Sequence, residues 1–312
     1  MTSRKTRGGA SSPAAPRRLP ADRSFLHFDP SHPPAIRVSP GEELIVEVQD
    51  AFGGERDINR IPAPWTPEWE GHPTPPATGP VYVEGAQPGH TLVVDILEIE
   101  LGSEGVVAIQ RNAGFLPERF TTPRMKRVPI QEGAVLFDGI RIPAYPNFGT
   151  FSTTPATGSR AGIAGYHGGD LDQKEVAAGN RVFLPVFVPG ALFGLGDPHA
   201  VVSDSIACGT GVECAATARL RFGVLARTIA RPRIETPQAL HIVGFGPDLD
   251  TAARDAIEQG VAFLAGEKGM DEEDAYMLLS LVGDLVVGTS PRPIMGVRLV
   301  IPKPVLNQVG PA

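Results

Sequence analysis

The sequence predicts a mainly β protein of the α+β class, with sandwich-like or barrel-like sheets and a helical pair near the C-terminus. Glycine and proline supply 36 and 32 of the 312 residues, which is well above average usage and typical of many turns and short strands. Short runs of β-branched and large apolar residues stand between these turn signals over most of the chain. Helical spacing of apolar residues begins only after residue 249.

The first 22 residues are predicted to form a disordered basic tail. They contain five Lys and Arg residues, several Ala, Ser and Pro, and hardly any large apolar side chain. Such a segment buries too little surface to offset the entropy that ordering costs. It also has no apolar stretch of the kind found in a secretory signal, so we expect no signal peptide.

Residues 23–150 are predicted to form an N-terminal β-rich domain. The expected strands are residues 44–48, 81–83 and 91–99. In the last of them, Leu92, Val94 and Ile96 make one face wholly apolar, as in a sandwich or barrel. The irregular span 50–80 is longer than most connections, and loops of this length are often functional.

Residues 151–312 are predicted to form a second β-rich domain that carries the C-terminal helices and most of the polar motifs. The expected strands are residues 182–188, 213–225, 239–245 and 294–305. Pro185 lies within the first of these and suggests an edge or a bulge. One helix is expected from an N-cap at Asp250 to the glycines at 266 and 269, and a second from Asp271 to Gly283.

Charge and cysteine content narrow the classes of function. The formal net charge of −7 gives no electrostatic reason to expect nucleic acid, and no apolar run is long enough to predict a membrane span. The two cysteines, Cys208 and Cys214, are too few for a disulfide scaffold, so we expect free thiols in a reducing cytoplasm.

Polar residues gather between residues 166 and 213 in a way that a core does not require. They are His167, Gly168, Gly169, Asp170 and Asp172 on one loop, followed by Asp197, His199, Asp204 and Glu213. An Asp-x-His pair with further carboxylates can bind zinc or another divalent ion. By spacing alone, a capped turn and a surface carboxylate are the favoured interpretation.

Three motifs in this region resemble the acetamidase/formamidase family. They are HGGDLD at 167–172, VFLPVFVPGALFGLGDPH at 182–199 and CGTGVE at 208–213, against the family's GGNMD, LPVFVPGALFSxGDGHAxxGDGE and CGTxIE. Residues 48–54, 78–89 and 275–284 agree as well. The similarity spans roughly residues 26–305 and keeps its order.

This resemblance implies a β-rich, homo-oligomeric enzyme that hydrolyses short aliphatic amides, or a lactam, to a carboxylate and ammonia or an amine. Amide hydrolysis needs activated water, a stabilised oxyanion and a proton for the departing nitrogen. A divalent metal, with zinc as the first choice, would supply the first two. The implied metal ligands are Asp50, Asp172 and His199, the catalytic carboxylates Glu213, Asp204 and Asp197, and the substrate or loop residues His167, Gly168, Gly169 and Asp170.

Three alternatives remain. Cys208 is an alternative nucleophile, because some amidases use a thiolate. The segment 65–69, with two tryptophans, is expected to cover the core or an interface, or else to form a lid. Ile206 stands where the family motif has an acidic residue, so the chain is either an active amidohydrolase or a diverged, catalytically weak member that binds a small ligand or metal.

Overall fold

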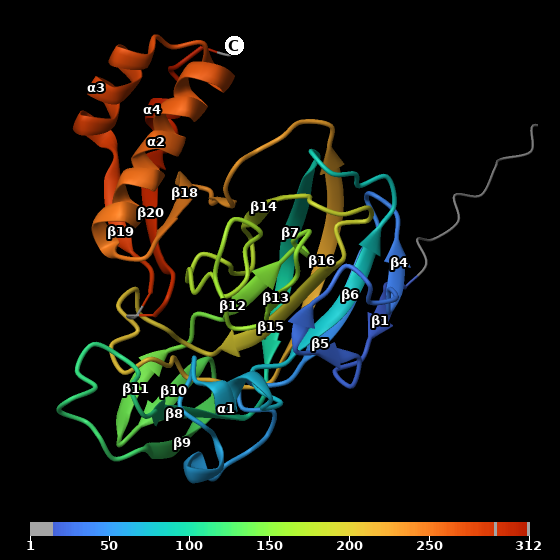
Figure 1. Cartoon of the computed structure of the whole chain (residues 1–312), viewed down its shortest axis with the longest axis vertical. Coiled ribbons are helices and arrows are strands. Elements are labelled where there is room, and N and C mark those ends of the chain that lie inside the picture. The colour runs from blue at the N-terminus through green and yellow to red at the C-terminus, as the bar shows by residue number, and fades with distance from the viewer. Residues whose placement is uncertain (1–14, 290–291, 311–312) are drawn as a thin grey trace, which may run out of the picture.

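The computed structural model describes residues 15–289 and 292–310, and its main layer is a mixed nine-stranded sheet (Figure 1). Alternating residues build its central strands, since every second side chain of β5 is buried. In spatial order the strands are β1 (Arg17–Leu19), β5 (Glu43–Val48), β16 (Ala216–Leu225), β7 (Thr91–Leu101), β14 (Arg181–Pro185), β17 (Arg233–Glu235), β18 (Ala239–Gly246), β20 (Met295–Pro302) and β19 (Asp284–Val287).

A smaller sheet packs on this layer and completes a sandwich. Its strands are β12 (Asn147–Ser152), β15 (Phe193–His199), β6 (Ala77–Val83) and β2 (Ser24–Phe25), with β4 (Ile36–Val38) also paired to β6. Phe193 of β15 contacts Phe151 of β12 and Phe222 of β16, with ring centroids 4.8 and 5.5 Å apart. The main hydrophobic core therefore lies between the two sheets.

A third sheet extends one end of the sandwich, and a two-stranded pair completes the set. The third sheet contains β8 (Glu104–Ile109), β9 (Arg124–Gln131), β10 (Ala134–Phe137) and β11 (Ile140–Pro143), and the pair is β3 (His27–Phe28) with β13 (Ser159–Arg160). Val128 and Val135 of the third sheet pack on Val212 and Cys214. These contacts tie the third sheet to the segment just before β16.

The three C-terminal helices gather on the strands at the other end of the large sheet (Figure 1). They are α2 (Leu249–Lys268), α3 (Glu272–Val282) and α4 (Lys303–Leu306), which share a second core with β18 and β20. The predicted helical pair is confirmed, with Asp271 as the N-cap of α3 and Gly269 ending α2 in the left-handed region. The N-cap of α2 is Asp248 rather than Asp250, because the Asp248 carboxylate accepts a hydrogen bond from Thr251 N.

The prediction of a mainly β fold is confirmed, while the described residues form a sandwich and no closed barrel. Pro185 ends β14 inside the large sheet, at a register position where only β7 pairs with it. This explains how an interior strand accommodates a proline. The predicted strand at 213–225 begins at Ala216, and the one at 294–305 ends at Pro302, where α4 follows.

The predicted disordered tail is too long. Residues 1–14 lie outside the described part of the chain, but Arg17–Leu19 forms β1 and pairs in parallel with β5. Arg17 and Arg18 form ion pairs with Glu42 and Glu47, and Leu19 enters the core. A short basic segment therefore becomes ordered because a sheet edge supplies partners for its backbone.

Strands from both sides of residue 150 share the two sheets of the sandwich, since β7 pairs with β14 and β16, and β6 pairs with β15. Cys208 and Cys214 are both free thiols, as expected. In the described part of the chain, no helix has the length and apolar character needed to cross a bilayer.

Candidate active site

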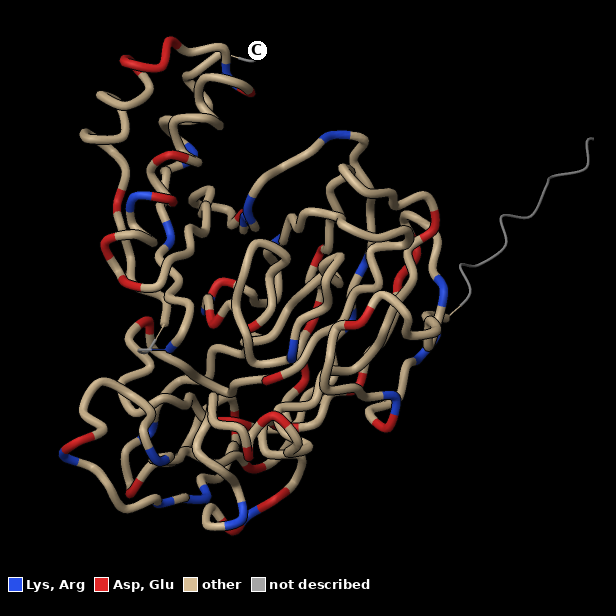
Figure 2. Tube along the Cα trace, in the orientation of Figure 1, with Lys and Arg blue, Asp and Glu red and all other residues tan. Residues whose placement is uncertain are grey.

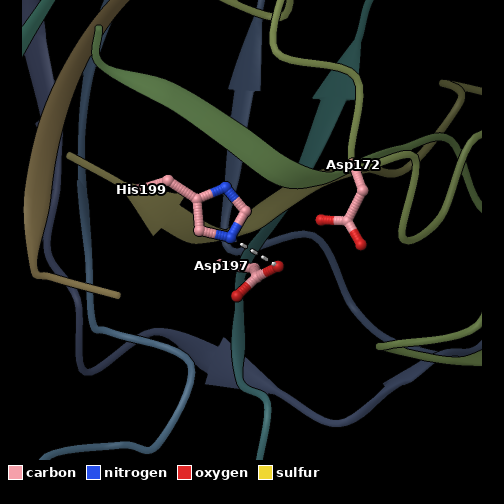
Figure 3. A group of neighbouring side chains, drawn as sticks. All are labelled: Asp172, Asp197 and His199. Atoms are coloured by element: carbon pink, nitrogen blue, oxygen red, sulfur yellow. Dashed lines mark ion pairs between the residues drawn. The ribbon is translucent and has the colours of Figure 1, made fainter. Parts of the chain in front are cut away.

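Asp172, Asp197 and His199 lie together at the end of β15, and their ligand atoms are all within 4.8 Å of one another. Asp197 and His199 belong to β15, and Asp172 belongs to the loop that follows β13. Figure 3 shows the three side chains converging on one space, with an ion-pair contact between Asp197 and His199. One imidazole and two carboxylates form a donor set suited to a divalent metal.

His199 is held so that one ring nitrogen faces the cluster. Its Nδ1 lies 3.0 Å from Oδ1 of Asn147, which sits directly opposite it in the β12–β15 pair. An amide oxygen only accepts, so Nδ1 is the donor in this contact. Nε2 then faces Asp197 Oδ2 at 3.4 Å and Glu213 Oε2 at 3.2 Å. A metal-ligating histidine is typically oriented by such a contact through its other nitrogen.

Glu213 lies just before β16 and contacts the cluster through His199. Its Oε1 accepts a hydrogen bond from Gly211 N at 2.8 Å. Its Oε2 is buried and makes no hydrogen bond, although it lies close to His199 Nε2. A buried carboxylate oxygen without a partner is costly unless a proton or cation completes it.

A buried guanidinium borders the cluster on its other side. Arg292 forms ion pairs with Asp170 and Asp172, and its side chain is only 5% exposed. Asp170 also accepts a hydrogen bond from Thr150 Oγ1 at 3.2 Å. Arg292 uses Oδ2 of Asp172, so Oδ1 of Asp172 stays available to the cluster.

The crowding of carboxylates shifts the ionisation of the cluster. Burial, followed by repulsion from Asp172, raises the pKa of Asp170 to about 7 despite Arg292. Burial and Glu213 raise the pKa of Asp197 to about 6. Burial would lower the pKa of His199, but Glu213 and Asp197 hold it well above its usual value. Protons on these groups therefore compete with a cation for the same site.

The backbone allows the carboxylates to approach one another. Asp172 and Asp197 both have positive φ, at 52° and 55°, in a region where aspartate is tolerated better than most residues. A Cβ on Gly149 of β12 would lie 2.1 Å from Asp197 Oδ2 and 2.6 Å from Asp172 Oδ1. Gly149 therefore leaves the space in which the two carboxylates meet.

A cavity of about 80 Å³ opens onto the cluster. Its polar wall includes Asp170, Asp172, Asp197, His199, Glu213, Thr210 and Arg292, and its apolar wall includes Phe52, Pro64, Trp65, Trp69, Pro75 and Ile206. The long 50–80 segment thus reaches the site, with η1 (Ile58–Arg60) and α1 (Pro67–Glu70) inside it. Both tryptophans line the cavity, as a lid over the site would require.

Ile206 is a buried part of the apolar wall, with 3% of its surface exposed. Its φ of 43° is rare for a β-branched side chain. The position that is acidic in the family motif therefore faces the cavity in this chain as an alkyl group.

Two of the carboxylates expected from the sequence lie outside this group. Asp50 accepts hydrogen bonds from Phe52 N and Gly54 N and pairs with Arg56 at 2.8 Å, so it shapes the loop that begins at residue 51. Asp204 lies between Lys174 at 2.6 Å and Arg298 at 2.8 Å. Both carboxylates are already paired with cations.

The loop residues expected near the substrate pack behind the site. His167 is buried, and burial lowers its pKa to about 4. A Cβ on Gly168 would lie 2.3 Å from Phe151 O, and one on Gly169 would lie 2.0 Å from Ile163 O. Gly168 thus lets this loop pack closely against β12, and Gly169 lets it pack against residue 163; of the four loop residues expected near the substrate, Asp170 lines the cavity.

The surroundings of the two thiols differ. Cys208 is half-buried, and its Sγ lies near Thr210. Burial raises the pKa of Cys214 to about 12, with Glu213 adding to the effect. A catalytic thiolate needs a lowered pKa and a nearby base.

Sequence reasoning missed Asn147 and Arg292. Asn147 follows Tyr145-Pro146 at the start of a strand, and Arg292 stands between two prolines. A polar residue fixed by neighbouring prolines is a weak signal by itself. Only the register of β12 on β15 and the return of the chain before β20 bring these two residues to the cluster.

The chain is similar to known acetamidases and formamidases. The model of the acetamidase/formamidase family matches residues 18–163 and 156–307. A formamidase of Methylophilus methylotrophus is 25% identical over 282 residues, which cover 67% of this chain and 66% of that protein. The chain spans 55–66% of the lengths of the curated relatives that it matches.

Solved structures share the fold over nearly the whole chain. The acetamidase from Bacillus halodurans has a TM-score of 0.86 and 32% identity, over 94% of this chain and 99% of that one. A predicted acetamidase/formamidase from Thermoanaerobacter tengcongensis has a TM-score of 0.88 and 30% identity, over 94% and 97% of the two chains. With the family model matching almost all of its described residues, this chain belongs to the acetamidase/formamidase family.

Proposed function

We propose that the chain hydrolyses a small aliphatic amide, of the formamide or acetamide type, or a lactam. The observation that supports this proposal is the convergence of His199 Nε2, Asp197 Oδ2 and Glu213 Oε2 beneath a small cavity. The apolar wall suits a hydrogen or short alkyl group on the acyl side, and the polar wall suits the amide. Family membership supports the same chemistry.

The donor set fits a divalent metal, with zinc as our first choice. Asp172, Asp197 and His199 would hold it, and Glu213 Oε2 beside them is a buried oxygen that lacks a hydrogen-bond partner. Such a metal would lower the pKa of water to about 7 and polarise the amide carbonyl. Asp197, expected from the sequence as a catalytic carboxylate, is assigned here as a ligand.

The chain's own groups would perform the remaining steps. Glu213 Oε2 would accept a proton from the attacking water and pass it to the departing nitrogen, which makes ammonia or an amine the leaving group. Asn147 would orient His199 through Nδ1, and Arg292 would orient Asp172. Trp65 and Trp69 would exclude bulk water from the cavity.

Ammonia release from a panel of short amides, with ring opening measured for lactams, tests this function. We expect turnover by the zinc-loaded chain, loss of turnover after chelation, and recovery when zinc is added back. Full turnover by protein shown to be metal-free by elemental analysis would overturn the metal assignment.

Absence of turnover on the whole panel would instead favour a diverged, ligand-binding member of the family. Ile206 is the observation behind this second candidate, since it places an alkyl group in the cavity wall. Ile206→Glu would then be the first variant to assay, because it restores the acid of the family motif.

We also infer a homo-oligomer in a reducing, cytoplasmic compartment. Tyr276, Met277 and Leu281 of α3 are 60%, 57% and 81% exposed, and such neighbouring apolar side chains are typical of contact surfaces. The two free thiols support the compartment. Sedimentation velocity would test the oligomer.

A further inference from the structure

Arg292 is the one Arg or Lys residue among those that line the cavity, within the part of the chain that the structure describes. It faces a crowded set of acids, since four carboxylates also line this cavity: Asp170, Asp172, Asp197 and Glu213. Its side chain is 5% exposed, so water screens its charge only weakly. The fixed positive charge of a guanidinium does not titrate in the physiological range.

The contacts of Arg292 are specific. One terminal nitrogen pairs with Asp170 Oδ2, and the other pairs with Asp172 Oδ2. The remaining oxygen of Asp172 points toward Asp197, because both carboxylates approach the space left open at Gly149. Arg292 is thus bound to the outer side of the carboxylate whose inner side belongs to the candidate metal centre.

Two effects of Arg292 on a bound cation oppose one another. By fixing Asp172, it reduces the ordering that metal binding requires, which favours binding. By placing a buried positive charge one carboxylate away from the metal, it opposes binding. The repulsion is the larger effect, because the loop already fixes Asp172 through its own backbone, with Asp172 N bonded to Gly149 O.

We propose that Arg292 is a built-in counter-cation of the carboxylate cluster, which stabilises the metal-free chain and lowers its affinity for divalent metal. This inference rests on the metal centre of the proposed function. It assigns Arg292 a positioning and charge-balancing role in the site. The chain would then be able to lose its metal without unfolding, and its metal content would follow the supply of metal.

The test is a pair of measurements on the full-length chain: Zn²⁺ affinity by competition with a chromophoric chelator, and Tm with and without Zn²⁺. For Arg292→Gln we expect Zn²⁺ to bind roughly tenfold more tightly than to wild type, a lower Tm without metal, and a larger rise in Tm when metal is added. For Arg292→Lys, which keeps the charge, we expect a Zn²⁺ affinity within about threefold of wild type.

Arg56→Gln is the matched control. Arg56 pairs with the buried Asp50 at 2.8 Å, outside the group of candidate ligands. Its removal should lower Tm and leave the Zn²⁺ affinity unchanged. This variant separates a general loss of stability from a change in the charge of the site.

The outcomes distinguish this inference from the proposed function. If wild type binds Zn²⁺ and Arg292→Gln binds it equally or more weakly, the counter-cation role is wrong while the metal centre stands. If neither protein binds Zn²⁺, the metal centre is overturned together with this inference. Tighter binding by Arg292→Gln but not by Arg56→Gln supports both.

Discussion

Arg292 and Arg298 are both buried, and both bind side chains from the segment 170–175, yet their surroundings differ. Arg298 contacts Gln173, Glu175 and Asp204, at 3.1, 3.0 and 2.8 Å. Lys174 also pairs with Asp204, so two cations meet two carboxylates. Arg292 pairs with Asp170 and Asp172, and the cavity that they line also holds two further carboxylates and one histidine.

This difference separates a structural cluster from a candidate functional one. The group around Arg298 is balanced in charge and holds the 170–175 and 203–206 segments against β20. The group around Arg292 has an excess of negative charge and opens onto a cavity. To recognise a functional site, the number of cations buried beside the acidic residues is therefore more informative than the burial of those acidic residues itself.

The largest effect on activity should come from removing the His199 imidazole, which belongs to the group around Arg292 with its excess of negative charge. His199→Asn should lower amide turnover by roughly 10³-fold, because a proposed metal ligand and its contact with Asn147 are lost together. Ammonia release with zinc present measures this. His241→Asn changes another buried histidine, and it should keep turnover within about threefold of wild type. Equal losses in the two variants would contradict the distinction between the clusters.

Removing Arg298 from the charge-balanced group should lower the free energy of unfolding. Arg298→Met leaves Glu175 and Asp204 without their shared partner, and removing one member of a buried ion pair costs about 3–5 kcal/mol. Urea unfolding of metal-free protein measures this loss. Arg219→Met removes exposed ion pairs to Glu43 and Glu98, so it should cost at most about 1 kcal/mol. A folded Arg298→Met protein with wild-type stability would show that the network is dispensable.

A smaller effect should appear as a dependence of stability on pH. Burial, and secondly Arg298, lower the pKa of His241 to about 4. Unfolded His241 binds a proton near pH 6.5, so the folded chain loses stability as pH falls from about 6.5 toward 4. His241→Phe should reduce this acid-induced loss by about 2–3 kcal/mol, measured by urea unfolding at pH 7 and pH 4. If His241→Phe loses as much stability as wild type between pH 7 and pH 4, His241 does not titrate in that pH range.

The sequence predicts the strands better than their ends. β5, β7 and β18 follow from runs of apolar and β-branched residues. The predicted start of β16 is too early, because the alternation of residue types that indicates this strand already begins at Glu213. In the structure Glu213 forms isolated bridges with Val106 and His199 before the regular pairing begins at Ala216.

In the site, likewise, the sequence predicts some residues and not the contacts that decide their roles. Asp172 and His199 could be proposed because they lie in motifs with a recognisable order. Asp50 and Asp204 also lie in motifs, but Arg56, Lys174 and Arg298 neutralise them, and those pairings exist only in three dimensions. Asn147 meets His199 through strand register alone, which no local pattern encodes.

Gly149 has a consequence for interpreting related sequences. The methyl group of an alanine at this position would occupy the point where Asp172 and Asp197 meet. Gly149→Ala should therefore abolish activity although every acidic and basic residue stays in place. We therefore expect a homologue that keeps every charged residue of the cluster, but has a side chain at this position of β12, to be inactive. A glycine at position 149 is thus as informative about activity as the two carboxylates for which it leaves space.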